Sequence, residues 1–178
     1  MATQASRNLA KQDLHSVGNL VSTRKHIMDF ANGGLYVEDV DNFHLVQGEL
    51  SATSGEMEVK YLTDATHPKE MTFLSAGSEY HNLPFETIES FFNGKGDKER
   101  IVYLTQGLIF DTSAFEPDTG IAPEDIKAGH FAHYDPTKKA FLIHDGAHAD
   151  YATASVKFMV RRELQPFFSK SVVRLIVI

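Results

Sequence analysis

The chain has 178 residues, enough for one domain with a sizeable core, and its content of 42% hydrophobic and 23% charged residues excludes a disordered or fibrous protein. The absence of cysteine excludes disulfides, thiolate metal ligands and a cysteine nucleophile, and the net charge of −7 argues against direct nucleic-acid binding. No apolar run approaches the ~20 residues that span a bilayer, and the first residues lack a secretory signal, so we expect a soluble protein with no membrane partner.

The first 28 residues form a basic segment with few large apolar side chains. Four basic residues and one acidic residue give this segment a charge of +3, which leaves −10 on residues 29–178. The Gly18-Asn19 pair interrupts any helical pattern, although a short helix near residues 9–17 stays open. We therefore predict a flexible, extended N-terminal arm over 1–28, either a frayed end or a segment that orders on a neighbouring subunit, followed by a β-rich domain over 29–178.

From Gly33 onwards, short apolar runs rich in Val, Ile, Phe and Tyr alternate with clusters of Gly, Pro, Asn and Asp. The runs have the length of β-strands, and the clusters favour tight reversals of the chain. Many short strands at this spacing predict a mostly β fold, as a single β-barrel or sandwich-like domain.

One stretch inside this β pattern has helical spacing. Four apolar residues between positions 85 and 92 recur at helical intervals, while Pro84 suits a first helical turn and Gly94 suits a C-terminal cap. We predict one short helix over about 84–93. The aromatic pairs Phe91-Phe92 and Phe167-Phe168 are either core residues, which is the more common case, or an exposed patch for a partner.

Two later stretches predict specific strands. Residues 130–134 and 140–144 are apolar runs of matching length around a turn that opens at Asp135-Pro136, which indicates a β-hairpin. Residues 172–178 are apolar except for Arg174. Such a strand should be buried on both faces, either centrally in the sheet or against another subunit.

Four of the nine histidines gather between positions 130 and 148, and imidazoles with nearby carboxylates are ligands for first-row metals. Strand alternation argues against such a site, because His130 and His133 would face opposite sides of the sheet. His144 and His148 would share a face only if the residues between them stayed extended. We therefore predict no metal site and no cofactor, and keep metal binding as the alternative. Its candidate ligands are His130, His133, His144 and His148, with Asp145 and Asp150 as additional oxygen ligands.

No complete catalytic motif is present. The acidic residues at 38, 39 and 41 lack the glycine and distant glutamate of a calcium loop, no Gly-x-Ser-x-Gly elbow marks a reactive serine, and residues 93–100 lack phosphate-loop spacing. We predict no catalytic residues and a non-enzymatic protein. Two alternatives stay open: a small β-barrel metalloprotein or cupin-like enzyme that uses the histidines, although the cupin His-x-His pattern followed by Glu is missing, and a ligand-binding barrel.

The order of features resembles that of small structural proteins of tailed bacteriophages, of the head decoration or capsid cement type. It comprises the polar arm, the opening FANGGLYVEDVDNFHLVQGEL, the phrase DIKAGHFAHYDPTKKAFLIHD and a strand that ends the chain, and it covers roughly residues 30–178. The resemblance implies a virion component, assembled in the host cytoplasm, that binds or stabilises a phage capsid through contacts of the β domain and the arm. The implied partners are the major capsid protein or other virion proteins, and further copies of the chain in a homo-oligomer.

Overall fold

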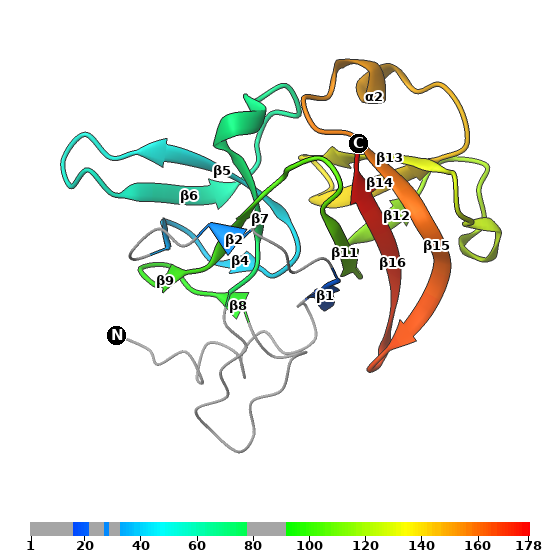
Figure 1. Ribbon diagram of the computed structural model, residues 1–178, viewed down its shortest axis with the longest axis horizontal. Coiled ribbons are helices and arrows are strands. Elements are labelled where there is room, and N and C mark those ends of the chain that lie inside the picture. The colour runs from blue at the N-terminus through cyan, green and yellow to red at the C-terminus, as the bar shows by residue number, and fades with distance from the viewer. Residues whose placement is uncertain (1–15, 22–26, 29–32, 78–91) are drawn as a thin grey trace.

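A computed structural model describes residues 16–21, 27–28, 33–77 and 92–178, and in this part most of the regular elements are β-strands (Figure 1). The strands form two seven-stranded sheets and one two-stranded sheet. The mostly β, barrel-like or sandwich-like prediction is confirmed.

The first large sheet, called the N-terminal sheet, collects strands from residues 27–103. Its neighbouring strands are antiparallel except for the β3–β6 pair. In spatial order the strands are β2 (Ile27–Met28), β10 (Ile101–Tyr103), β7 (Thr72–Ser75), β5 (Leu45–Leu50), β6 (Met57–Tyr61), β3 (Gly34–Tyr36) and β9 (Lys98–Glu99). Beside it, β4 (Val40–Asp41) pairs with β8 (Phe92–Asn93).

The second large sheet, called the C-terminal sheet, collects strands from residues 109–177 and one strand from the start of the chain. In spatial order these are β1 (Gly18–Leu20), β11 (Ile109–Thr112), β16 (Lys170–Val177), β15 (Phe158–Phe167), β13 (Phe131–Asp135), β14 (Ala140–His144) and β12 (Phe115–Pro117). The predicted hairpin is confirmed as β13–β14, and the predicted C-terminal strand is β16, which lies inside the sheet between β11 and β15.

Helical structure in the described residues is short. It consists of 3₁₀ turns at Lys69–Met71 and Pro123–Asp125 and of one α-helix, α2 (Ala149–Thr153), which the sequence did not predict. None of the described helices has the length or the apolar character needed to cross a membrane.

Most of the helix predicted over 84–93 lies outside the described residues, and its last two positions form strand β8 instead. The reason is local pairing. Asn93 Nδ2 donates to the Val40 carbonyl oxygen and to Asn42 Oδ1, both at 3.0 Å, and Phe92 is buried. These contacts hold the segment extended against β4.

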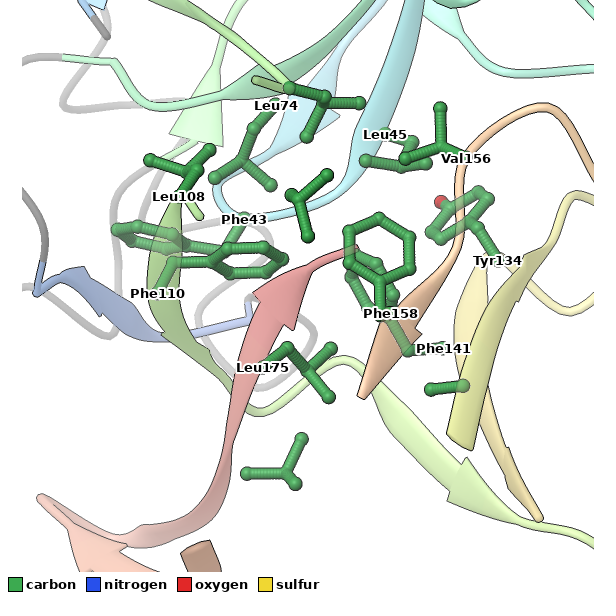
Figure 2. Packing of buried hydrophobic residues seen from close by; sticks show 14 of the residues in the cluster. Phe43, Leu45, Leu74, Leu108, Phe110, Tyr134, Phe141, Val156, Phe158 and Leu175 are labelled. Atoms are coloured by element: carbon green, nitrogen blue, oxygen red, sulfur yellow. The ribbon is translucent and has the colours of Figure 1, made fainter. Parts of the chain in front are cut away.

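The main hydrophobic core lies between the two large sheets (Figure 2). Phe158 lies at its centre and meets the rings of Phe141 and Phe110 edge-on, at centroid distances of 5.1 and 5.9 Å. Successive side chains of strand β5 in the N-terminal sheet belong to two different hydrophobic cores. Leu45 faces the main cluster, and its neighbour Val46 faces a second, smaller one. Burial on both faces explains the continuous apolar runs in these strands.

Two segments of the predicted arm belong to the sheets. Strand β1 pairs with β11, with Gly18 opposite Thr112, and β2 pairs with β10. A Cβ atom at Gly18 would lie 2.1 Å from the Asp111 carbonyl oxygen, so this glycine serves a close backbone approach rather than a break in a helix. The prediction that all of residues 1–28 form an arm is therefore corrected, because residues 18–20 and 27–28 are strands of the two sheets. Residues 1–15 and 22–26, with the helix left open near 9–17, lie almost entirely outside the described residues.

Candidate functional site

The β13–β14 hairpin brings two histidines onto one face of the C-terminal sheet. Phe131 pairs with His144, and His133 lies two residues after Phe131, so His133 and His144 share a face. Their ring centroids are 5.5 Å apart. His133 is 1% exposed and His144 is 3% exposed. Both imidazoles are therefore removed from bulk water.

His148 joins this pair from the turn that follows β14. The chain bends at Asp145 and Gly146 and returns, so that His148 becomes the N-cap of α2. Its ring centroid lies 4.8 Å from that of His133 and 5.4 Å from that of His144. The residues between His144 and His148 therefore do not have to be extended, as the sequence analysis assumed, for the two rings to lie together. We call His133, His144 and His148 the histidine cluster.

His130 is separate from the histidine cluster. It precedes β13 and alternates with Phe131, which places it on the side of Ala132 and Tyr134, two residues of the main core. The prediction that His130 and His133 face opposite sides of the sheet therefore agrees with the alternation along β13. Asp145 is exposed and, among the described residues, is not part of the compact group of possible ligands around His133.

Hydrogen bonding and burial define the protonation state of two cluster members. His144 Nδ1 donates to the Gly146 carbonyl oxygen at 2.7 Å, so its Nε2 carries the lone pair. Burial lowers the pKa of His144, and burial together with the neighbouring His148 and His144 rings lowers the pKa of His133 to about 4. Both rings are neutral at pH 7. His144 Nε2 and His133 Nδ1 are buried without a hydrogen-bond partner in the described structure.

Two carboxylates approach His148. Asp150 Oδ2 lies 4.0 Å from His148 Nδ1, and the same nitrogen accepts the backbone N–H of Asp150 at 3.2 Å. Asp118 Oδ2 lies 3.8 Å from His148 Nε2. One possible ligand atom from each of His133, His148 and Asp150 falls within 4.8 Å of the others. The site thus combines imidazole nitrogens with carboxylate oxygens.

Aromatic rings enclose the histidine cluster. The Tyr151 ring lies 4.9 Å from that of His144 and 5.5 Å from that of Phe131, measured between centroids. Tyr151 and Asp118 were not among the site residues predicted from the sequence. Tyr151 has a local signal, because it lies three residues after His148, one turn along a helix. Asp118 has none, since it reaches the site through the parallel β12–β14 pairing.

A second feature is the free end of the β15–β16 hairpin, which extends beyond the rest of the C-terminal sheet (Figure 1). Strand β13 pairs only with residues 158–159 of β15, and β11 pairs only with residues 173–176 of β16. Between these ends and the turn, β15 and β16 form strand pairs with each other alone among the described residues, from Gln165 opposite Val172 to Phe167 opposite Lys170. The free end of the hairpin consists of residues 161–172. We call these residues the ribbon.

The tip of the ribbon is apolar and exposed. Phe168 has a positive φ of 54° at the turn, is 67% exposed, and contacts the Phe167 ring edge-on at 4.9 Å. Arg161 and Arg162 are exposed on the same ribbon. Of the aromatic pairs in the sequence, Phe168 is thus exposed and Phe167 half-buried, whereas Phe92 is buried and Phe91 lies outside the described residues.

Comparison with known proteins identifies the chain's origin. Residues 11–178 match the YonC prophage protein family. The SPbeta prophage-derived protein YonC of Bacillus subtilis (strain 168) is 35% identical over 164 residues, which is 90% of this chain and 87% of that protein. The expected phage origin is supported. This chain belongs to the YonC prophage protein family.

Proposed function

We propose that the protein is a non-enzymatic structural component of the phage particle, which binds or stabilises the capsid through contacts between its ribbon and neighbouring subunits. The prophage origin of the family supports a role in the phage life cycle. The partners we propose are the major capsid protein or other virion proteins, together with further copies of this chain, and the proposed location is the virion.

The single observation that carries this proposal is the ribbon. An isolated two-stranded hairpin is at best marginally stable in water, so a ribbon that leaves its sheet gains stability when it packs against another surface. Burial of the Phe168 ring would contribute on the order of 1–2 kcal/mol per contact. Contacts of that size become strong when many copies bind a symmetric shell together.

Charge also suits the ribbon to docking. The ribbon carries exposed arginines, whereas the whole chain has a net charge of −7. A ribbon with basic residues at its base and an apolar tip is repelled less by acidic surfaces, including those of other copies, than the acidic body itself. In this proposal the ribbon makes the contacts with neighbouring subunits that were expected from the sequence for the basic N-terminal arm.

The test compares Phe168→Asp with Leu50→Asp. Leu50 is 68% exposed at the end of β5, so it matches Phe168 in exposure but lies far from the ribbon in the sheet order. Each variant of the full chain is mixed with particles from an induced lysogen that lacks the gene, and binding is measured by co-sedimentation. We expect Phe168→Asp to weaken binding about tenfold and Leu50→Asp to leave it unchanged. Equal binding by wild type and Phe168→Asp would exclude the ribbon as the contact.

A further inference from the structure

We propose that the histidine cluster binds one divalent first-row transition metal ion, with Zn²⁺ as the reference case, and that Asp150 supplies an oxygen ligand. This site is separate from the ribbon and goes beyond a structural role in the particle. It would act as a cross-link between the β13–β14 hairpin and helix α2.

The spacing of the three rings fits a shared metal ion. With zinc to nitrogen distances of about 2.1 Å and tetrahedral angles, the donor atoms lie about 3.4 Å apart and the imidazole centroids about 5 Å apart. The centroids of the histidine cluster are 4.8, 5.4 and 5.5 Å apart. Possible donor atoms of His133, His148 and Asp150 already lie within 4.8 Å of one another. His144 is not part of this compact group, so its ring would have to move towards the other donors to share the ion.

His144 already presents a nitrogen in the chemical form that a metal requires. The bond from His144 Nδ1 to the Gly146 carbonyl oxygen fixes the tautomer and leaves Nε2 free, which is the usual outer hydrogen bond of a metal-bound histidine. His148 Nδ1 faces Asp150, and to bind the ion it would release the backbone N–H of Asp150, from which it accepts a hydrogen bond at 3.2 Å. Asp118 Oδ2 lies 3.8 Å from the other ring nitrogen, Nε2, close enough to become its outer carboxylate partner once the ion is bound.

Aromatic packing alone does not account for the site. Packing against Phe131 and Tyr151 explains why the rings are together, but a buried ring nitrogen without a partner costs free energy. Two such nitrogens, His133 Nδ1 and His144 Nε2, occur in this one cluster. A metal ion would satisfy both. Nitrogen and oxygen donors without cysteine favour Zn²⁺, Ni²⁺, Co²⁺ or Cu²⁺ over Mg²⁺ and Ca²⁺.

The first test measures binding to the full chain, purified without a histidine tag and freed of metal by a chelator. We expect titration calorimetry with ZnCl₂ to give one site per chain, Zn²⁺ to raise Tm, and Co²⁺ to give the visible absorption of a tetrahedral complex. Absence of saturable binding at one equivalent, or binding without a rise in Tm, would overturn the proposal.

The second test uses variants with an internal control. His144→Asn and Asp150→Asn should weaken Zn²⁺ binding at least tenfold. Asp150 is exposed, so its variant is expected to keep the Tm of the metal-free protein even if the histidine variants lose stability. His130→Asn is the matched control, because His130 is also buried with an unpartnered Nδ1 but lies outside the cluster. Unchanged affinity in Asp150→Asn and His144→Asn, or an equal loss in His130→Asn, would contradict the assignment.

Discussion

His44 links the two halves of the molecule and makes its stability depend on pH. It lies just before β5 of the N-terminal sheet, and its Nδ1 is 3.0 Å from the Tyr134 hydroxyl on β13 of the C-terminal sheet. Burial lowers the pKa of His44 to about 4, although nearby Asp41 acts in the opposite direction. The folded protein therefore keeps this ring neutral under mildly acidic conditions.

The pH dependence follows from proton linkage. An unfolded histidine gains a proton near pH 6.5, whereas His44 in the folded state gains it only near pH 4. Between these values the unfolded state binds more protons, so stability is full above about pH 6.5 and falls as the pH drops towards 4. We expect a loss of about 3 kcal/mol from His44, with His133 acting in the same direction. Urea unfolding at pH 7.5 and 4.5 measures it, and His44→Gln should reduce the slope. A stability that does not change over this range would contradict the assignment.

Asp111 explains why the apolar residues 172–178 include one charged side chain, Arg174. Asp111 on β11 lies directly opposite, and the two side chains form a bidentate pair with N to O distances of 2.8 and 2.9 Å. The Asp111 side chain is 10% exposed, so its loss would leave Arg174 without its acceptor. We expect Asp111→Ala to lower the free energy of unfolding by about 2 kcal/mol.

The control for Asp111 is Glu49, whose exposed side chain pairs with that of Lys60 on the neighbouring strand β6 at 3.3 Å. Exposed pairs contribute little in water, so Glu49→Ala should cost much less than Asp111→Ala. Chemical denaturation of both variants gives the comparison. A loss at Asp111 no larger than the loss at Glu49 would show that burial does not strengthen the pair.

At the scale of elements, the place of β1 depends on one glycine. A side chain at Gly18 would meet the backbone of Asp111 and the Phe43 ring at 2.1 and 2.6 Å, and neither the β11 backbone nor a buried ring can move freely. We expect Gly18→Ala to destabilise the fold by about 1–3 kcal/mol and to raise hydrogen exchange at the β1–β11 amides.

Gly146→Ala is the control for Gly18, because a Cβ there meets nothing within 4 Å. It should change stability by less than about 1 kcal/mol. If Gly18→Ala were as stable as Gly146→Ala, β1 would not be closely seated on β11.

The elements that sequence could predict are those with local signals. Matching apolar runs around a turn predicted the β13–β14 hairpin, and an apolar end predicted the central strand β16. Strand β1 was not predicted from the sequence. Its distinctive residue, Gly18, is required by close contact with β11, which is more than 90 positions away along the chain. Phe92 fitted a helical spacing, but the hydrogen bonds of Asn93 to the β4 region decide its conformation.

At the scale of the whole molecule, the histidines show which contacts can be predicted from the alternation of side chains along a strand and which cannot. Alternation correctly separated His130 from His133, since both belong to one strand region. It could not place His148, because a bend and a helix start return that residue to the sheet. The ribbon was also beyond prediction, since its exposure depends on where the neighbouring strands β11 and β13 stop pairing.

The proposed role in the particle makes the composition of purified particles the most direct test. Particles from an induced lysogen that carries the gene would be banded by density, washed at high salt, and analysed by quantitative mass spectrometry. We predict that this chain is present in a fixed ratio to the major capsid protein and that Phe168→Asp lowers this ratio. Recovery of the chain only in the unassembled fraction of the lysate, with none in the particles, would contradict the structural role.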